Sequence, residues 1–281
     1  MAQVALGLVN GAFYAMLSLG LAVIFGMLNV INFTHGAQFM MGAFAAWLLL
    51  GTLDVPFWAS LVLAPLIVGL FGVVIERLML KRIYHLDHLY GFLLTFGLAL
   101  IIEGLFQWKW GSSGAPYPAP ISGSTDLGFM FMPNYRLFVV VAALIICLAT
   151  WYGIERTKLG AYLRAAAENP TLVRAFGINV PRLITLTYGL GVALAALAGV
   201  MAAPIQQVSA LMGTNLVLVV FAVVVIGGMG SILGSIVTGF GLGLIEGLTK
   251  VYYPPASNTV IFIVMALVLL VKPAGLFGQT K

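Results

Sequence analysis

Residues 157–182, TKLGAYLRAAAENPTLVRAFGINVPR, interrupt an otherwise apolar sequence with a short basic segment. Charged residues make up 7% of the chain, yet five of them fall within this stretch. The sequence on either side consists almost entirely of Leu, Val, Ala, Phe and Gly. The contrast predicts a hydrophilic connection between membrane-spanning parts of the chain, with 153–182 as its extent.

The composition of the whole chain excludes an ordinary soluble fold. Its 281 residues are 62% hydrophobic, with a mean hydropathy of +1.11, whereas soluble domains are roughly half apolar and a quarter charged. At about 20 residues per span, the length allows about eight or nine membrane helices. We therefore predict an all-α polytopic transmembrane bundle with broken helices, in which residues 1–281 form a single domain.

The charged and reactive residues argue against several functional classes. The net charge of +5 is spread over separate loops without an aromatic-basic patch, so no nucleic-acid partner is expected. The single Cys147 excludes a disulfide framework and a cysteine metal site. The glycine-rich stretch 226–235 lacks the Lys-Ser/Thr pair of a phosphate-binding loop. Because no catalytic constellation lies in the spans either, we predict no catalytic, cofactor or metal site in this chain.

Nine apolar runs predict the spans, and the basic residues between them predict their orientation. The runs are 4–29, 36–52, 56–75, 89–107, 137–153, 183–203, 215–229, 231–249 and 259–271. When the ends alternate, one side of the membrane receives ten Lys and Arg residues, and the other receives only Lys109, Arg136 and Lys250. Basic loops stay in the cytoplasm. We therefore expect an outer N-terminus, a cytoplasmic C-terminus, a cytoplasmic 153–182 loop and an irregular external loop over 107–136.

Local signals inside the basic segment define two short helices. The first is predicted over 158–168. The second is predicted over 170–176, because Asn169 supplies an N-cap oxygen and Pro170 occupies the first helical position. Gly177 then ends it as a left-handed residue.

We expect the apolar residues of the second helix, Leu172, Val173 and Phe176, to project to one side. Two turns bury too little surface to be stable alone. The helix is therefore predicted to rest on the membrane surface or in the groove of a partner protein.

Two irregular places between apolar runs are candidates for a transport pathway. Polar residues cluster within 26–43, where they either satisfy backbone groups freed by a broken helix or hydrogen-bond a substrate. The glycines of 226–235 predict either a helix break beside a pathway or a simple tight turn. The candidate pathway residues are Asn29, Asn32, Thr34, His35, Gln38, Gly227, Gly228 and Gly230.

Further predictions concern helix packing and intramembrane charge. Glycines four residues apart, at 7 and 11 and at 239, 243 and 247, predict close approach of helices. Glu103 and Glu246 fall near the outer ends of their runs, where a charge costs less than at mid-bilayer. Glu246 is expected to pair with Lys250 one turn later, whereas Glu103 has no evident partner in the sequence.

Residues 165–182, AAAENPTLVRAFGINVPR, resemble the cytoplasmic coupling loop of ABC importer permeases, with Glu168 and Gly177 at the matching positions. The usual order Glu-Ala-Ala appears here as Ala-Ala-Glu. Residues 7–44 and 221–247 also resemble the branched-chain amino acid subgroup of that family, and its shorter permease in particular. The likeness extends over nearly the whole chain and rests on three separate motifs in the same order.

The resemblance implies a membrane-spanning permease subunit of an ATP-driven importer, in a bacterial inner membrane, for branched-chain or related neutral amino acids. It also implies a second homologous permease, two cytoplasmic ATPase subunits that bind ATP and Mg, and an external (periplasmic) substrate-binding protein. The residues expected to contact an ATPase are Arg164, Glu168, Asn169, Pro170, Leu172, Val173, Arg174, Phe176 and Gly177. Urea or short amides as substrates, or an ion-coupled secondary transporter, are the alternatives.

Overall fold

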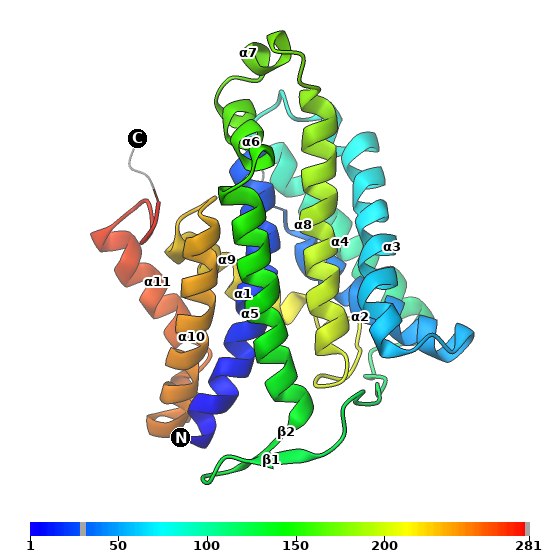
Figure 1. The fold of residues 1–281 in the computed structure, drawn as a ribbon, viewed down its shortest axis with the longest axis vertical. Helices are drawn as coiled ribbons and strands as arrows, with labels where there is room; N and C mark the ends of the chain where they lie inside the picture. Colours follow the sequence, from blue (N-terminus) through cyan, green and yellow to red (C-terminus); the bar gives the residue numbers. More distant parts are fainter. Residues whose placement is uncertain (29–31, 279–281) are drawn as a thin grey trace.

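Helices, most of them apolar, make up most of the computed structural model, which describes residues 1–28 and 32–278 (Figure 1). The α-helices of this part are α1 Ala2–Leu28, α2 Thr34–Leu53, α3 Phe57–Leu78, α4 His88–Trp110, α5 Asn134–Glu155, α6 Lys158–Glu168, α7 Pro170–Ala175, α8 Val180–Ala202, α9 Thr214–Gly227, α10 Ile232–Tyr252 and α11 Val260–Val271. The 3-10 turns η1 Leu80–Arg82 and η2 Pro254–Ala256 follow α3 and α10. A hairpin of β1 Ser124–Asp126 and β2 Phe131–Pro133 pairs Thr125 with Met132.

Each of the nine predicted apolar runs coincides with a helix. Within the described residues, seven helices are long and apolar enough to cross a membrane, namely α1 to α5, α8 and α10. The other two apolar helices, α9 and α11, have 14 and 12 residues, and at 1.5 Å per residue they are shorter than a hydrocarbon core of about 30 Å. The prediction of an all-α polytopic bundle is confirmed.

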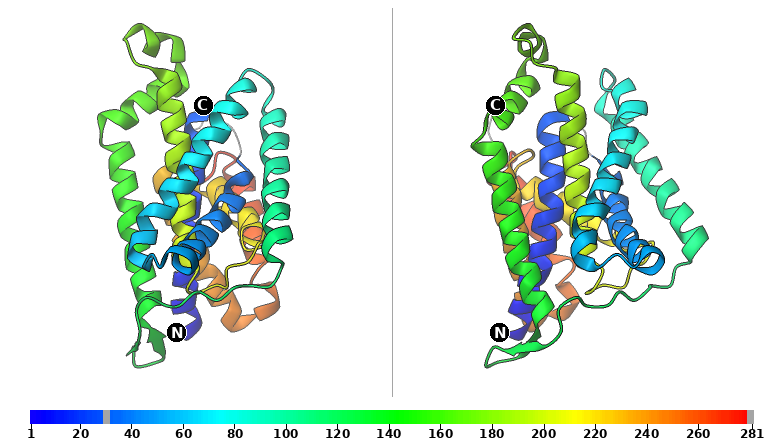
Figure 2. Two further views of the ribbon diagram at one scale, coloured as in Figure 1. Left: turned by 90° about the vertical axis from the view of Figure 1, so that its right-hand side faces the viewer. Right: turned by 45° about the vertical axis from the view of Figure 1, so that its right-hand side comes forward.

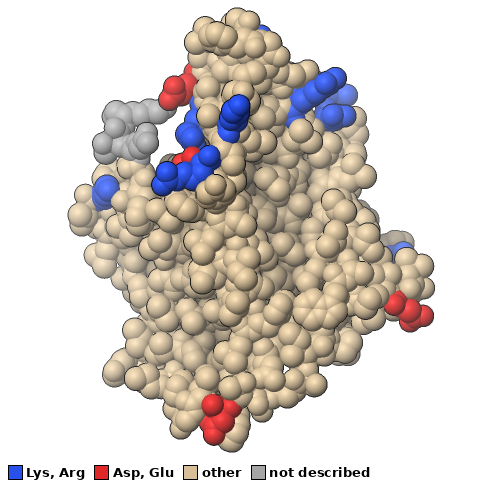
Figure 3. All heavy atoms as spheres, viewed as in Figure 1, with Lys and Arg blue, Asp and Glu red and all other residues tan. Residues whose placement is uncertain are grey.

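The two ends of the bundle differ in structure and charge. The N-terminus lies at the end that carries the hairpin, and α6 and α7 form the opposite end (Figure 1). In both views of Figure 2, the segment between α4 and α5 crosses beneath the bundle at the hairpin end. On the face drawn in Figure 3, most Lys and Arg side chains gather at the α6–α7 end. Because successive helices run in alternating directions, the loops predicted to be basic meet at the α6–α7 end.

Close helix packing in the centre joins α1 to α10 through glycines. A Cβ atom added to Gly243 would lie 2.4 Å from the Gly11 Cα, and one added to Gly7 would lie 2.4 Å from the Gly243 carbonyl oxygen. No side chain other than hydrogen fits at such distances, so the small residues let the two backbones touch. The predicted role of these glycines in packing is confirmed.

Two helices begin inside the bundle rather than at its ends. At the start of α2, the His35 Nε2 lies 2.9 Å from the Leu17 carbonyl oxygen, in the middle of α1. A Cβ atom on Gly36 would lie 2.7 Å from the carbonyl oxygen of Gly213, the residue before α9. The first turns of α2 and α9 therefore meet within the bundle, and the predicted broken helices are present.

The chain after α11 returns to the turn between α9 and α10. The backbone N–H of Leu276 donates to the Ile226 carbonyl at 2.8 Å, and that of Phe277 donates to the Gly227 carbonyl at 3.0 Å. These carbonyls belong to the last turn of α9, where no intrahelical donor remains for them. The segment 272–278 therefore completes the end of α9.

Candidate functional site

The α6–α7 segment is attached tightly to the end of α5. A Cβ atom on Gly160 would lie 1.5 Å from the Ile154 carbonyl oxygen, so only glycine lets α6 fold back at this point. The Arg164 Nη1 reaches the same carbonyl at 3.3 Å and the Glu155 carboxylate at 3.2 Å. Arg164, which the sequence assigned to an ATPase contact, thus joins α6 to α5. Gly160 was not among the residues predicted to matter for this segment.

The predicted caps of α7 are present. The Asn169 side chain accepts a hydrogen bond from the Leu172 N–H at 3.0 Å, and Pro170 is the first residue of the helix. Gly177 has a φ of +79°, and its N–H donates to the Arg174 carbonyl at 2.9 Å. The helix ends at Ala175, one residue before the predicted end. Both ends of this six-residue helix are therefore fixed by local chemistry.

The side chains of α7 point in two directions. Val173 is buried in a small cluster with Ala166 of α6 and Val180 of α8. Leu172 is 55% exposed and Phe176 is 77% exposed. The prediction that these three residues share one side is wrong, because Val173 is the contact that holds α7 to the bundle. Leu172 and Phe176 remain as a free apolar surface, while the nearby Glu168 side chain is exposed.

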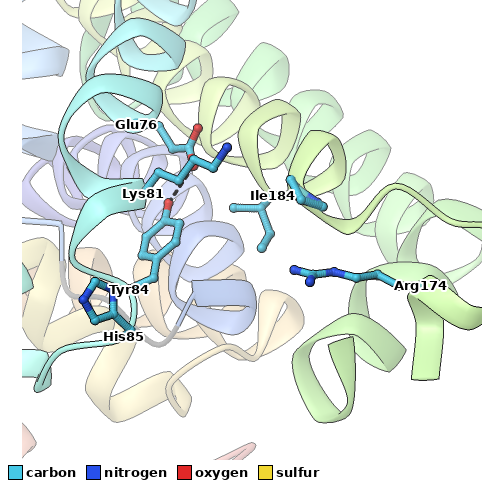
Figure 4. Close-up of a pocket in the computed structure, with 7 residues that line it drawn as sticks. Glu76, Lys81, Tyr84, His85, Arg174 and Ile184 are labelled. Atoms are coloured by element: carbon cyan, nitrogen blue, oxygen red, sulfur yellow. Dashed lines mark hydrogen bonds between the residues drawn. The ribbon is translucent and has the colours of Figure 1, made fainter. Parts of the chain in front are cut away.

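A cavity of about 340 Å³ lies beside α7, between α3, the loop that follows it and the first turn of α8 (Figure 4). The lining residues are Glu76, Lys81, Tyr84, His85, Arg174, Pro181 and Ile184. Arg174 extends from α7 toward the cavity from the side opposite Glu76 and Tyr84 (Figure 4).

Glu76 forms the buried floor of this cavity, with 1% of its surface exposed. Its carboxylate accepts hydrogen bonds from the Tyr84 hydroxyl at 2.9 Å and the Thr185 hydroxyl at 2.7 Å. Burial, followed by the charge of Glu76, raises the pKa of Tyr84, so this hydroxyl remains a donor at neutral pH. Sequence reasoning missed Glu76 because it stands beside Arg77 at the end of an apolar run. One signal was available in the sequence: Glu76 has no basic residue three or four positions away on either side that could pair with it along the helix.

The predicted pathway residues around α2 form a buried polar cluster. Asn32 donates to the Gln38 side chain at 3.1 Å, and Gln38 in turn donates to the Tyr188 hydroxyl at 3.4 Å. The Thr34 hydroxyl donates to the Thr95 carbonyl at 2.9 Å. Within the described residues, the Asn32 Oδ1 and the second ring nitrogen of His35 have no hydrogen-bond partner. Asn29, another of the predicted residues, lies outside the described part of the chain.

The predicted glycines of the α9–α10 turn do not join that cluster. Gly228 and Gly230 have φ values of +102° and +87° and shape a tight turn at the α6–α7 end. A Cβ on Gly227 would lie 2.7 Å from the Gly234 carbonyl carbon, and one on Gly228 would lie 2.4 Å from the Gly278 nitrogen. Ser231 caps α10 by accepting from the Gly234 N–H at 3.1 Å. The structure has a tight turn at these glycines, and their place beside a transport pathway stays a prediction.

The two predicted intramembrane carboxylates both have partners. Glu246 is buried and accepts from Tyr14 at 2.7 Å, from Asn10 at 3.3 Å and from Lys250. The expected Glu246–Lys250 ion pair is confirmed. Glu103 accepts from the Thr214 hydroxyl at the start of α9. Among the described residues, no group of three His, Cys, Asp or Glu side chains is arranged to hold a metal ion.

Known proteins match this chain over nearly its whole length. A family model described as "Branched-chain amino acid transport system / permease component" matches residues 3–270. The high-affinity branched-chain amino acid transport system permease protein LivH of Escherichia coli (strain K12) is 27% identical over 292 residues, covering 98% of this chain and 94% of the relative. The corresponding protein BraD of Pseudomonas aeruginosa is 26% identical over 294 residues, covering 99% and 96%.

Two further likenesses are weaker. The ribose import permease protein RbsC of Escherichia coli (strain K12) is 27% identical over 227 residues, which is 75% of this chain and 67% of the relative. The solved structure of PsaBC from Streptococcus pneumoniae in complex with Fab has a TM-score of 0.50 at 14% identity. It covers 95% of this chain and 89% of its own, and the likeness is one of fold alone.

Proposed function

We propose a mechanism for this chain, which belongs to the family of branched-chain amino acid transport system permease components. Within that family it is the permease subunit of a branched-chain amino acid ABC importer in the inner membrane, and it is not an enzyme. Nucleotide is bound by partner ATPase subunits, and a substrate-binding protein delivers the solute. In this mechanism, α7 receives the movement of an ATPase and passes it to the spans.

The observation that carries the proposal is the exposed apolar surface of α7. Leu172 and Phe176 are turned to solvent on a helix that is capped at both ends and held by the buried Val173. A large exposed apolar side chain at the tip of a fixed helix is suited to a groove on another protein. Because α7 packs against α6 and α8, a push on it is transmitted to both.

The meeting of α2 and α9 supports a substrate route through the centre of the bundle. Both helices begin there, so the positive ends of their dipoles lie near the buried Asn32 and Thr34. Half-helix ends of this kind bind anionic substrate groups in transporters. We assign them the carboxylate of a passing amino acid, with Asn32, Thr34, His35 and Gln38 as polar lining of the route.

The complete assembly in this proposal has a second homologous permease and two ATPases, which bind ATP and Mg on the α6–α7 side. That side faces the cytoplasm, with the C-terminus, because it holds the basic loops. The N-terminus and the hairpin face the external binding protein. Mass measurement of the complex, extracted gently from membranes, tests the composition, because an ion-coupled transporter needs no ATPase subunit.

Crosslinking tests the role of α7 directly. The single Cys147 is buried, so a cysteine introduced on the surface is labelled selectively. We expect Phe176→Cys to crosslink to the ATPase through a short bifunctional reagent, and Trp108→Cys, which is 85% exposed at the hairpin end, to remain uncrosslinked. The reverse pattern would place the motor on the wrong side and refute the proposal.

Uptake measurements test the substrate. Proteoliposomes that contain the importer and its binding protein should take up labelled leucine in an ATP-dependent manner. An excess of unlabelled urea or acetamide should leave that uptake unchanged. Competition by either compound would instead favour the alternative substrate class.

A further inference from the structure

We infer that the cavity between α3, α7 and α8 is a binding site for a zwitterionic amino acid with an apolar side chain. It lies at the α6–α7 end and is connected to the buried α2 cluster through Tyr188, which accepts from Gln38 and packs with Tyr84 of the cavity wall. The inference rests on the proposed function, because its ligand is of the same class as the imported substrate. The site would sense the amino acid that has accumulated inside the cell.

The floor of the cavity suits an ammonium group. Each carboxylate oxygen of Glu76 accepts one hydroxyl hydrogen bond, from Tyr84 and from Thr185. A carboxylate has about four acceptor positions, so about two remain for a ligand. An ammonium group carries three donors and a positive charge, which matches the acceptors left on a buried anion.

The opposite wall suits a carboxylate group. Arg174 enters the cavity from this wall, whereas the Lys81 side chain extends toward it from the side of Glu76 (Figure 4), and neither makes an ion pair within the described residues. His85 lines the same side of the cavity as Lys81 (Figure 4). Pro181, in the first turn of α8, adds the positive end of a 23-residue helix. A guanidinium and an ammonium group are well placed to hold the two oxygens of a carboxylate.

The remaining wall and the size of the cavity define the rest of the ligand. Ile184 and the ring of Pro181 offer an apolar surface. A volume of about 340 Å³ lies at the lower end of the range for small-molecule sites, roughly 300–1,000 Å³. A simple anion would be repelled by Glu76, and a simple cation by Lys81 and Arg174. A compact molecule with both charges satisfies both walls.

Occupancy has a mechanical consequence. The ligand would bridge Glu76 on α3 and Arg174 on α7, the helix that the proposed mechanism moves. Holding them at one spacing opposes that movement. The bound amino acid therefore slows further import, and the accumulated product limits its own uptake.

Binding to the purified importer in lipid nanodiscs, without the external binding protein, tests the site. L-leucine should bind, while 4-methylpentanoate, which lacks the ammonium, and 3-methylbutylamine, which lacks the carboxylate, should each bind about tenfold more weakly or worse. Glu76→Gln and the surface change Lys81→Gln should each weaken leucine binding by a similar factor. The control Lys158→Gln, which removes an exposed lysine at the same end, should leave it unchanged.

The outcomes separate this inference from the proposed function. Equal binding of 4-methylpentanoate and leucine would identify an anion site, and leucine binding that survives Lys81→Gln and Glu76→Gln would locate it elsewhere; either result overturns the inference. Leucine preloaded with ATP inside proteoliposomes should slow initial uptake in the unmodified importer and less so in Lys81→Gln. Normal uptake with no internal binding refutes this site alone, whereas absent uptake by the unmodified importer refutes the proposed function.

Discussion

The left-handed residue that ends α7 gives the sharpest test of the coupling mechanism. Gly177 has a φ of +79°, and a Cβ atom there would meet nothing within 4 Å. A substitution therefore adds backbone strain without a steric clash. The strain for an L side chain in this region is roughly 1–2 kcal/mol, at the upper end for a β-branched residue.

That strain is comparable with the contact that holds α7 in place. Val173 is the buried side chain of this helix, and burying a valine contributes about 2 kcal/mol. For Gly177→Val, a strain of about 2 kcal/mol cancels this contribution, so α7 holds its native position about half the time. For Gly177→Ala, a strain of about 1 kcal/mol leaves the native position occupied about 85% of the time.

The assay is the number of leucine molecules imported per ATP hydrolysed, measured in proteoliposomes with the partner ATPases. We expect this ratio to fall to about half or less for Gly177→Val and only slightly for Gly177→Ala. Gly177→Asn is the matched control, because asparagine adopts positive φ values far more readily than other residues, and it should behave as the unmodified chain does. An unchanged ratio in Gly177→Val with intact assembly, or an equal loss in Gly177→Asn, would refute the reasoning.

Three further changes probe the packing around the site. Gly243→Val pushes a side chain into the α1 backbone 2.4 Å away, and should lower the melting temperature by about 5 °C in a thermal-shift assay, whereas Gly241→Val, with nothing within 4 Å, should not. Gly160→Ala places a Cβ 1.5 Å from a carbonyl of α5 at a cost of about 3 kcal/mol, so uptake should fall sharply, while Gly153→Ala, again with open space, should transport normally. Lys250→Met should lower the free energy of unfolding in detergent by about 1–2 kcal/mol. The loss is smaller than for a fully buried pair, because the lysine is 35% exposed and two neutral donors remain on the buried Glu246 carboxylate. Equal effects of a variant and its glycine control, or an unchanged unfolding midpoint for Lys250→Met, would contradict these expectations.

The sequence predicted most of the fold because its decisive signals are local. Apolar runs are continuous, so their helices could be assigned without knowing any tertiary contact. The caps of α7 were equally accessible, since Asn169, Pro170 and Gly177 act within one turn of themselves.

The site was less predictable because its contacts connect distant parts of the chain. Val173 turns inward on account of α6 and α8, which no two-turn pattern reveals. Glu76 bonds Thr185, 109 positions away. The meeting of α2 with α9 depends on two glycines far apart in sequence, Gly36 and Gly213. Contacts between residues so far apart in sequence follow from the three-dimensional arrangement, and no local sequence pattern indicates them.

The closure of α9 by the segment after α11 has a consequence for the order of assembly. The carbonyls of Ile226 and Gly227 accept their hydrogen bonds from the N–H groups of Leu276 and Phe277, which are made some fifty residues later. Until the segment 272–278 has folded back onto this turn, water is the donor left for these two carbonyls. The end of α9 is therefore completed only after α11 and the segment that follows it have been made, and an intermediate arrested after α10 would have a hydrated, uncapped helix end in this half of the bundle.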